Sequence, residues 1–283
     1  MAVFTNQAQL SYNDSIKNSN IAVGEILEVL SATKTAVREE YGQNDSVTYV
    51  VSLVNSGATA LNGLTLTDNL GEYPFGAGTL VPLTYIPGTI RYYINGILQM
   101  APAVAAGPPL VISGINLPAG GNGILVYEAE VNQYAPLDAE GSITNTAVVS
   151  GAGITPVTVE ETVTTEDGPN LTITKSICPV PVTENGTLTY TFVIQNTGNT
   201  AAVATDNVAV TDLFDPILTN LSVSFNGATW TDGVQYNYDE TTGLFATVPG
   251  QITVPAATFT QDPTTGVWVI NPGVSTLVVA GTV

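Results

Sequence analysis

The sequence contains two copies of one pattern, and this internal repeat limits the folds that the chain can adopt. Lys34 and Tyr49 are 15 positions apart, as are Lys175 and Tyr190. Further matched segments are 55–57 with 196–198, 64–68 with 208–212, 95–96 with 226–227, 115–119 with 252–256, and 125–131 with 277–283. We therefore expect two domains with the same strand order.

Turn residues and β-formers dominate both copies. The chain has 27 Gly and 17 Pro spread along its length, and no stretch keeps a 3.6-residue apolar period for long. The pairs Asn95-Gly96 and Asn226-Gly227 are typical of hairpin turns. Short strands joined by turns indicate an all-β chain, and 283 residues are enough for two β-sandwich domains.

The copies differ at their ends. The first continues through residues 143–149 and 157–163, whereas nothing follows Val283 in the second. The missing pattern appears at the N-terminus, where residues 4–11 match 143–150 and residues 21–29 resemble 157–163. The sequence predicts a donor strand and connector at 1–29, a first domain at 30–167, and a second domain at 168–283 that lacks its closing strand.

Three arrangements can follow from this spacing. The N-terminal strand can close the second domain of a neighbouring copy, which makes a head-to-tail contact and an open filament unless the rotation closes a ring. The tail can instead be disordered, with the second domain sufficient by itself, or it can fold back onto its own chain. We favour the first, because an unpaired apolar sheet edge promotes aggregation.

Polar residues lie on the faces predicted to be buried. Strand side chains alternate between faces, so each charged or amide residue can be assigned apolar companions. Lys34 shares its face with Leu30, Ala32 and Ala36; Lys175 with Leu171, Ile173 and Ile177; Asp68 with Leu64, Leu66 and Leu70; Asp212 with Val208, Val210 and Phe214; Asn145 with Ile143, Ala147 and Val149; and Asn6 with Phe4, Ala8, Leu10 and Tyr12.

A Lys, an Asp and an Asn in one core allow two interpretations. One is a buried Lys–Asp ion pair capped by an Asn hydrogen bond. The other is covalent, because a buried amine tends to lose its proton and a buried carboxyl tends to keep one. The free amine can then attack the Asn carboxamide while the Asp shuttles protons, giving a Lys–Asn isopeptide bond and ammonia.

The order of Lys, Tyr, Asn-x-Gly, Thr-Asp and Thr-Asn-x-Ala resembles the conserved-repeat Ig-like domains of Gram-positive surface proteins. It also resembles the isopeptide-forming domains of pilins and collagen-adhesin-type proteins. The resemblance implies two tandem Ig-like sandwiches. It implies a bond between Lys34 and Asn145 with Asp68 as catalyst, and a second site with Lys175 and Asp212 whose partner is Asn6 of a neighbouring copy.

Composition narrows the possible partners. With 24 Asp plus Glu against 5 Lys plus Arg, the net charge of −19 disfavours nucleic acid and anionic membranes. The chain has no His, and no calcium-loop motif appears, so we expect no metal site and no cofactor. The one cysteine, Cys178, can pair between chains, but a small buried residue beside a strand end is the preferred interpretation.

The N-terminus has no signal-peptide pattern, and no run of 18 apolar residues predicts insertion into a membrane. We expect a structural subunit of a self-assembling extracellular filament, a homopolymer released by cell lysis and carried on a spore surface in one scenario. The alternative is an adhesin-like module that binds an unidentified host or surface ligand through Tyr92, Tyr93, Trp230 or Trp268. A conventional enzyme is the weakest hypothesis, because no nucleophile motif, metal cluster or phosphate loop appears.

Overall fold

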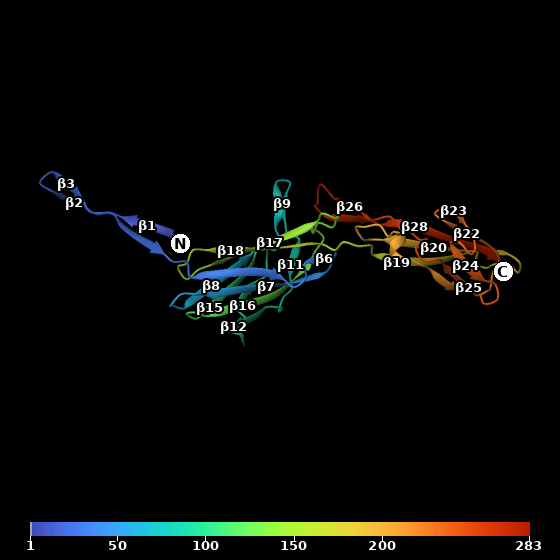
Figure 1. Ribbon diagram of the computed structural model, residues 1–283, viewed down its shortest axis with the longest axis horizontal. Coiled ribbons are helices and arrows are strands. Elements are labelled where there is room, and N and C mark those ends of the chain that lie inside the picture. The colour runs from blue at the N-terminus through green and yellow to red at the C-terminus, as the bar shows by residue number, and fades with distance from the viewer. Residues whose placement is uncertain (1) are drawn as a thin grey trace. The chain divides into compact units, whose positions relative to one another are not determined.

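The computed structural model describes residues 2–283, without the side chains of Ala2 and Ile26. These residues form 28 strands and one short 3-10 helix, η1 (Ala204–Asp206), so the all-β prediction is confirmed. Figure 1 shows the strands along the chain. The chain divides into unit 1, Met1–Asn132 with Ile143–Val163, and unit 2, Gln133–Ser142 with Thr164–Val283.

Unit 1 is built from two sheets. The first has the order β13-β12-β16-β7-β5, with β11 also paired to β16, and the second has the order β14-β15-β8-β17-β18-β6. Their bounds are β5 (Leu30–Ala36), β6 (Glu40–Tyr41), β7 (Ser46–Asn55), β8 (Leu61–Asp68), β11 (Leu83–Tyr85), β12 (Arg91–Ile94), β13 (Ile97–Gln99), β14 (Ala103–Ala105), β15 (Leu110–Leu117), β16 (Asn122–Val131), β17 (Ser142–Ser150) and β18 (Val157–Thr165). A small hairpin joins β9 (Tyr73–Phe75) and β10 (Gly78–Leu80).

Alternating apolar residues make the core between these two sheets. On β7, Val47, Tyr49, Val51 and Leu53 are fully buried, and the residues between them are half-buried or exposed. Leu64 and Leu66 on β8 face them from the second sheet, also fully buried. Full burial of one such side chain contributes about 1.5–3 kcal/mol, so this period-2 pattern fixes which face of each strand points inward.

An asparagine holds the loop after β7. The buried Asn55 carboxamide donates to the carbonyls of Thr59 (2.8 Å) and Pro118 (2.9 Å) and accepts from Gly57 N–H (3.0 Å). In unit 2, Asn196 makes the matching bonds to Thr200, Pro255 and Gly198. The repeated Asn-x-Gly motif is therefore a structural clamp on a loop.

Unit 2 has a sheet of order β19-β20-β28-β22-β23 and a smaller one of order β21-β25-β24. Their bounds are β19 (Leu171–Cys178), β20 (Thr187–Asn196), β21 (Thr211–Leu213), β22 (Thr219–Phe225), β23 (Ala228–Trp230), β24 (Tyr236–Asp239), β25 (Leu244–Thr247) and β28 (Gly273–Thr282). A separate hairpin joins β26 (Thr258–Gln261) and β27 (Trp268–Asn271). Phe214, Phe245, Leu277 and Val279 are central to its core.

The N-terminal segment forms two consecutive antiparallel pairs. β1 (Ala2–Asn6) pairs with β4 (Ala22–Ile26), and β2 (Gln9–Tyr12) pairs with β3 (Ser15–Asn18). The single strand expected over residues 4–12 is thus interrupted. At the break between β1 and β2, the Gln7 amide donates to the carbonyl of Ser19, and the Ala8 N–H donates to the Ser19 hydroxyl.

Candidate cross-link sites

The first site joins the two sheets of unit 1. Lys34 lies on β5 and Asp68 ends β8, and both side chains are 0% exposed. The Lys34 ammonium donates to Asp68 Oδ2 at 2.7 Å and to the backbone carbonyl of Asn145 at 3.0 Å. Asp68 Oδ1 accepts from the Leu70 N–H at 2.8 Å. The predicted Lys, Asp and Asn of the first copy are therefore brought together in one core.

Asn145 completes this site from β17. It is fully buried, with Ile143, Ala147 and Val149 on the same face, and β17 pairs with β8 in the register Ala147↔Asp68. Neither its side-chain nitrogen nor its side-chain oxygen has a hydrogen-bond partner among residues 2–283. The hydrogen bond between Asn145 and the ion pair is therefore made by its backbone carbonyl, which accepts from Lys34, while its carboxamide stays unpaired at a cost.

The environment favours a neutral lysine. Burial lowers the pKa of Lys34, and the charges of Asp68 and Glu161 act against this shift. An amine must lose its proton before it can act as a nucleophile, and the lowered pKa of Lys34 acts in that direction. Asp68, in direct contact, is the nearest base for that proton.

Two tyrosines border Lys34 and Asp68. Tyr127 donates a hydrogen bond to Asp68 Oδ2, and its ring stacks on Tyr49 with centroids 5.6 Å apart. Lys34 Nζ lies 4.8 Å from the centre of the Tyr49 ring. Burial, and next the charge of Asp68, raise the pKa of Tyr127 well above its ordinary value, so its phenol stays protonated. The sequence contained both residues, but their contact with the site was not predicted.

The second site is only partly assembled. Lys175 on β19 forms an ion pair with Asp212 on β21, yet their side chains are 39% and 18% exposed. Lys175 Nζ lies 4.3 Å from the centre of the Tyr190 ring. Among residues 2–283, no asparagine forms a hydrogen bond with Lys175 as Asn145 does with Lys34.

The register of the strands confirms that the two sites correspond. Across from Lys34 on β7 is Val51, and across from Lys175 on β20 is Phe192. Tyr49 pairs with Tyr127, whereas Tyr190 pairs with Val279. Unit 2 therefore keeps the first tyrosine of the site and has valine in place of the second.

The face around Lys175 is open. Ile173 and Ile177 on β19 are 51% and 45% exposed, while the matching strand β5 of unit 1 buries Leu30 and Lys34. In the described chain, β21 pairs only with β25, whereas its counterpart β8 pairs with β15 on one side and β17 on the other. Unit 2 thus presents an unpaired strand edge and an uncovered apolar face.

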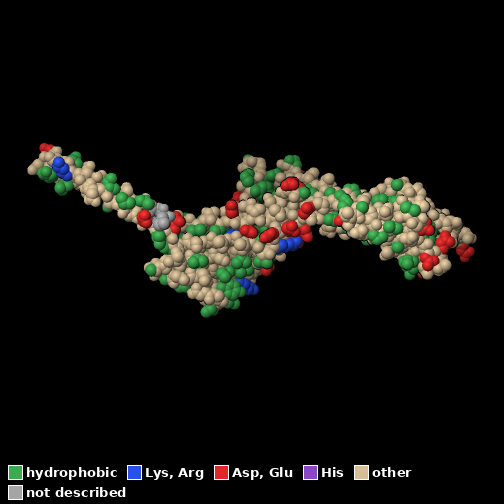
Figure 2. Space-filling model, in the orientation of Figure 1, with side chains coloured by type: hydrophobic (Ala, Val, Ile, Leu, Met, Phe, Trp, Pro, Cys, Tyr) green, Lys and Arg blue, Asp and Glu red, His purple; other side chains and the backbone are tan. Residues whose placement is uncertain are grey.

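The predicted donor residues are exposed. Phe4, Leu10 and Tyr12 are more than half exposed, and Asn6 and Ala8 are exposed as well. Figure 2 shows apolar side chains along this segment. Asn6 pairs with Ala22 across the β1–β4 ladder. Its docking to Lys175 of another copy remains a prediction.

Three other sequence interpretations have clear outcomes. Cys178 is exposed, so its prediction as a buried residue is wrong. Tyr92 is buried and its hydroxyl donates to the Asn116 carbonyl, and Trp230 packs on Phe225 with centroids 5.1 Å apart. Both contacts are structural, as those of aromatic residues in a sandwich usually are.

Within residues 2–283, no helix has the length and hydropathy needed to span a membrane.

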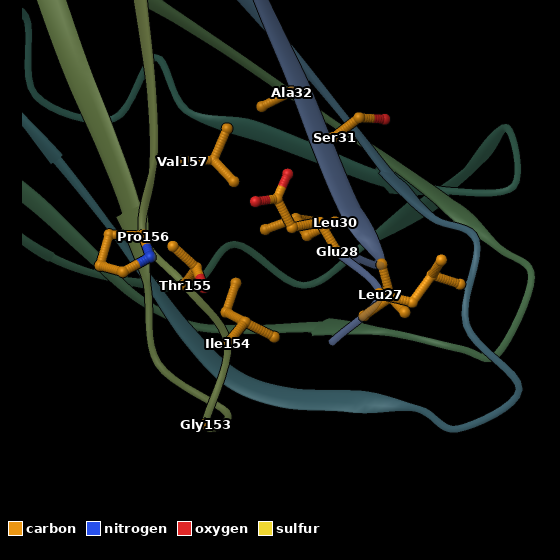
Figure 3. A pocket seen from close by; sticks show the side chains of 11 residues that line it. Leu27, Glu28, Leu30, Ser31, Ala32, Gly153, Ile154, Thr155, Pro156 and Val157 are labelled. Atoms are coloured by element: carbon orange, nitrogen blue, oxygen red, sulfur yellow. The ribbon is translucent and has the colours of Figure 1, made fainter. Parts of the chain in front are cut away.

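A cavity of about 550 Å³ lies elsewhere in unit 1. It is bordered by the connector residues Leu27 and Glu28, by the start of β5, and by residues 153–157 before and at the start of β18 (Figure 3). None of Lys34, Asp68 and Asn145 lines it. The cavity is therefore separate from the buried cluster of Lys34, Asp68 and Asn145.

Solved structures similar to this chain include pilins and adhesin domains. The pilus backbone RrgB of Streptococcus pneumoniae is 12% identical with a TM-score of 0.34, covering 86% of this chain and 55% of that chain. The major pilin BcpA of Bacillus cereus, as the D312A variant, is 10% identical with a TM-score of 0.38, covering 87% and 64%. ACE19, the collagen-binding subdomain of the Enterococcus faecalis surface protein ACE, is 7% identical with a TM-score of 0.29, covering 50% and 100%.

These are the classes of protein that the sequence resembles. The chain spans about half the length of RrgB. No protein-family model and no curated protein matches the sequence. At such identities and TM-scores, the similarity does not assign a function, which must be argued from the two sites themselves.

Proposed function

We propose that the chain is a structural subunit of an extracellular filament, assembled head to tail by strand donation and locked by Lys–Asn isopeptide bonds. The observation that carries this proposal is the contrast between the two units. Lys34 is sealed beneath β17 and β18 with Asn145 beside it, whereas Lys175 lies on an open face next to the unpaired edge of β21. Its location on a cell surface is part of the same proposal and is supported by the sequence resemblance to bacterial surface proteins.

The N-terminal strand pair β1–β4 has the features needed to cover the open face around Lys175. In unit 1, the face around Lys34 is closed by an antiparallel strand pair, β17 and β18, which precedes β19 in the chain. The pair β1–β4 likewise precedes β5, is antiparallel, and carries an asparagine in its first strand. Its exposed apolar residues, including Phe4 and Leu10, would be buried by docking on Ile173 and Ile177 of another copy.

A donated strand on the open side of β21 would be the fourth strand of this sheet and would satisfy backbone groups that otherwise face water. Strand addition supplies ladder hydrogen bonds, and apolar side chains at alternate positions supply affinity. Since the donor belongs to one copy and the acceptor to the next, the contact is heterologous and repeats without limit. This geometry makes a filament without a second kind of subunit.

The proposed reaction in unit 1 joins Lys34 to Asn145 and releases ammonium. Lys34 passes one proton to Asp68, and its free amine forms a bond to Cγ of Asn145. Asp68 passes that proton to Nδ2 of Asn145 and accepts a second one from the Lys34 nitrogen. The Cγ–Nδ2 bond breaks, Nδ2 leaves as ammonia, and the proton left on Asp68 leaves with it as ammonium. Lys175, Asp212 and Asn6 of the incoming copy would repeat these steps between subunits.

Deletion of residues 1–12 tests strand donation. We expect the truncated chain to form no filaments in negative-stain electron microscopy, because β1 and β2 are removed while β21 keeps its open edge. Light scattering after size exclusion should then report monomers, or irregular aggregates of the exposed face. As a control, a peptide of residues 1–26 added to the truncated chain should raise the melting temperature of unit 2 without restoring filaments. Filaments of the truncated chain alone would exclude donation.

A further inference from the structure

Tyr49 has a buried hydroxyl with nothing to bind. The residue is 0% exposed, and its hydroxyl has no hydrogen-bond partner among residues 2–283. A phenylalanine would fill the same space without leaving a polar atom unpaired. The matched position of the second repeat is again tyrosine, Tyr190. The tyrosine is thus repeated at the equivalent position, and in the first repeat its unpaired hydroxyl is costly, which indicates a use that the resting contacts do not show.

The neighbour of this phenol is the other unpaired group of the core. The Asn145 carboxamide is close enough to act against the rise that burial causes in the Tyr49 pKa, although the two groups do not reach hydrogen-bond geometry. Lys34 Nζ lies over the same ring at 4.8 Å. The phenol, the amine and the carboxamide thus meet at one place, and the first and third have free hydrogen-bonding capacity.

The proposed bond formation needs a donor at this place. When the Lys34 amine adds to Cγ of Asn145, the electrons of the carbonyl double bond move onto Oδ1, which becomes an oxyanion. Preorganised donors at such an oxygen are among the largest contributions to catalysis in a site without water. Asp68 already accepts hydrogen bonds from Lys34, from Tyr127 and from the Leu70 N–H, and the proposed reaction uses it as the base. It is therefore not the group that stabilises the oxyanion.

We infer that the Tyr49 hydroxyl is the donor that stabilises the oxyanion on Asn145 Oδ1 during isopeptide formation, and that Tyr190 has this role between subunits. The inference rests on the proposed function, because it has meaning only where the bond forms. Tyr127 has a different part: its hydrogen bond fixes Asp68 beside Lys34, and it is a positioning residue. Val279 at the matching position leaves Asp212 without such a bond from β28.

The test is a time course of bond formation in the full chain. Cell-free synthesis is stopped by acid at intervals, and intact mass reports the fraction that has lost about 17 Da, the mass of ammonia released by the condensation. The Tyr49→Phe variant should form the bond roughly 100-fold more slowly than the wild type, as when one oxyanion donor is removed. Tyr92→Phe is the matched control, since Tyr92 bonds Asn116 away from the site, and it should keep the wild-type rate.

A second measurement separates chemistry from packing. In an Asn145→Ala background, which cannot form the bond, adding Tyr49→Phe should leave the melting temperature unchanged or raise it, because the hydroxyl has no partner to lose. A lower melting temperature there would assign Tyr49 a packing role and overturn the inference. A wild-type rate for Tyr49→Phe would overturn it as well. A wild-type chain that never loses ammonia would instead overturn the proposed function itself.

Discussion

The Asn6→Ala variant is expected to lose the heat-stable ladder of multimers completely on a denaturing gel, while filaments still assemble in mild buffer. Asn6 would supply only the carboxamide that reacts with Lys175, and the apolar residues of β1 and β2 remain available for docking. Unit 1 should still lose about 17 Da, because Lys34 and Asn145 are untouched. Electron microscopy, gel electrophoresis and intact mass together measure these three outcomes.

A neighbouring amide provides the control for this variant. Gln7 lies next to Asn6, but its side chain donates to the Ser19 carbonyl within the tail, so Gln7→Ala should keep the ladder. Lys175→Arg should remove the ladder as Asn6→Ala does, since a guanidinium is not a nucleophile at neutral pH. A ladder that persists in Asn6→Ala would show that another residue makes the link between subunits.

Two substitutions in the core of unit 1 should separate the covalent bond from the buried charge pair. Asn145→Ala removes the bond but keeps Lys34 paired with Asp68, whereas Asp68→Ala removes the bond and also leaves Lys34 buried without its partner. A cross-link between positions 111 apart should contribute on the order of 4–5 kcal/mol, by analogy with a disulfide that closes a loop of this length. Loss of one partner of a buried pair costs about 3–5 kcal/mol more.

These differences are measurable by urea unfolding in the Asn6→Ala background, where the chains are not joined covalently. The free energy of unfolding of unit 1 should fall in the order wild type, Asn145→Ala, Asp68→Ala. Equal stability of the wild type and Asn145→Ala would show that unit 1 carries no cross-link.

The Asp68→Ala variant should also respond to pH in a defined direction. Burial already lowers the pKa of Lys34 below its ordinary value of 10.5, and the largest opposing influence is Asp68. Without that carboxylate, the unfolded chain binds a proton on Lys34 that the folded chain does not, between the lowered pKa and 10.5. The free energy of unfolding must therefore rise with pH through this window. A fall in stability over that range would contradict a buried, neutral Lys34.

Much of the fold could be predicted from the sequence, because apolar alternation and repeat spacing are visible within short segments of the chain. The alternation of Leu64, Leu66 and Asp68 fixed the inward face of β8, and all three are buried. Asn145 and Lys34 could be placed in one core because the same polar residues recur on apolar faces in the second copy. The registers of β5–β7 and β19–β20 bear out this correspondence.

Other features depend on contacts that no local pattern encodes. The interruption of the N-terminal strand comes from side-chain bonds between Gln7, Ala8 and Ser19, which are 11 and 12 residues apart. The bond from Tyr127 to Asp68 crosses from one sheet to the other. The one available signal was the replacement of Tyr127 by Val279 between otherwise similar segments, which marks the position as different in the two sites.

The pairing of β1 with β4 changes the thermodynamics of strand donation. A disordered tail would lose about 1–2 kcal/mol of backbone entropy for each residue that it orders on docking. Because the segment already forms antiparallel pairs, part of that loss precedes the encounter between subunits. Apolar residues such as Phe4 and Leu10 are then displayed on a partly shaped surface.

The location of Lys34 near the start of β5 and of Asn145 within β17 has a mechanical consequence. In the proposed filament, tension would enter the sandwich of unit 1 at Leu30, where β5 begins, and leave it at Val163, the last residue of the unit. With Lys34 bonded to Asn145, that force crosses directly between the two side chains, and the 111 positions separating them carry no load. A stretched subunit would then keep folded roughly 370–400 Å of chain that would otherwise extend under tension.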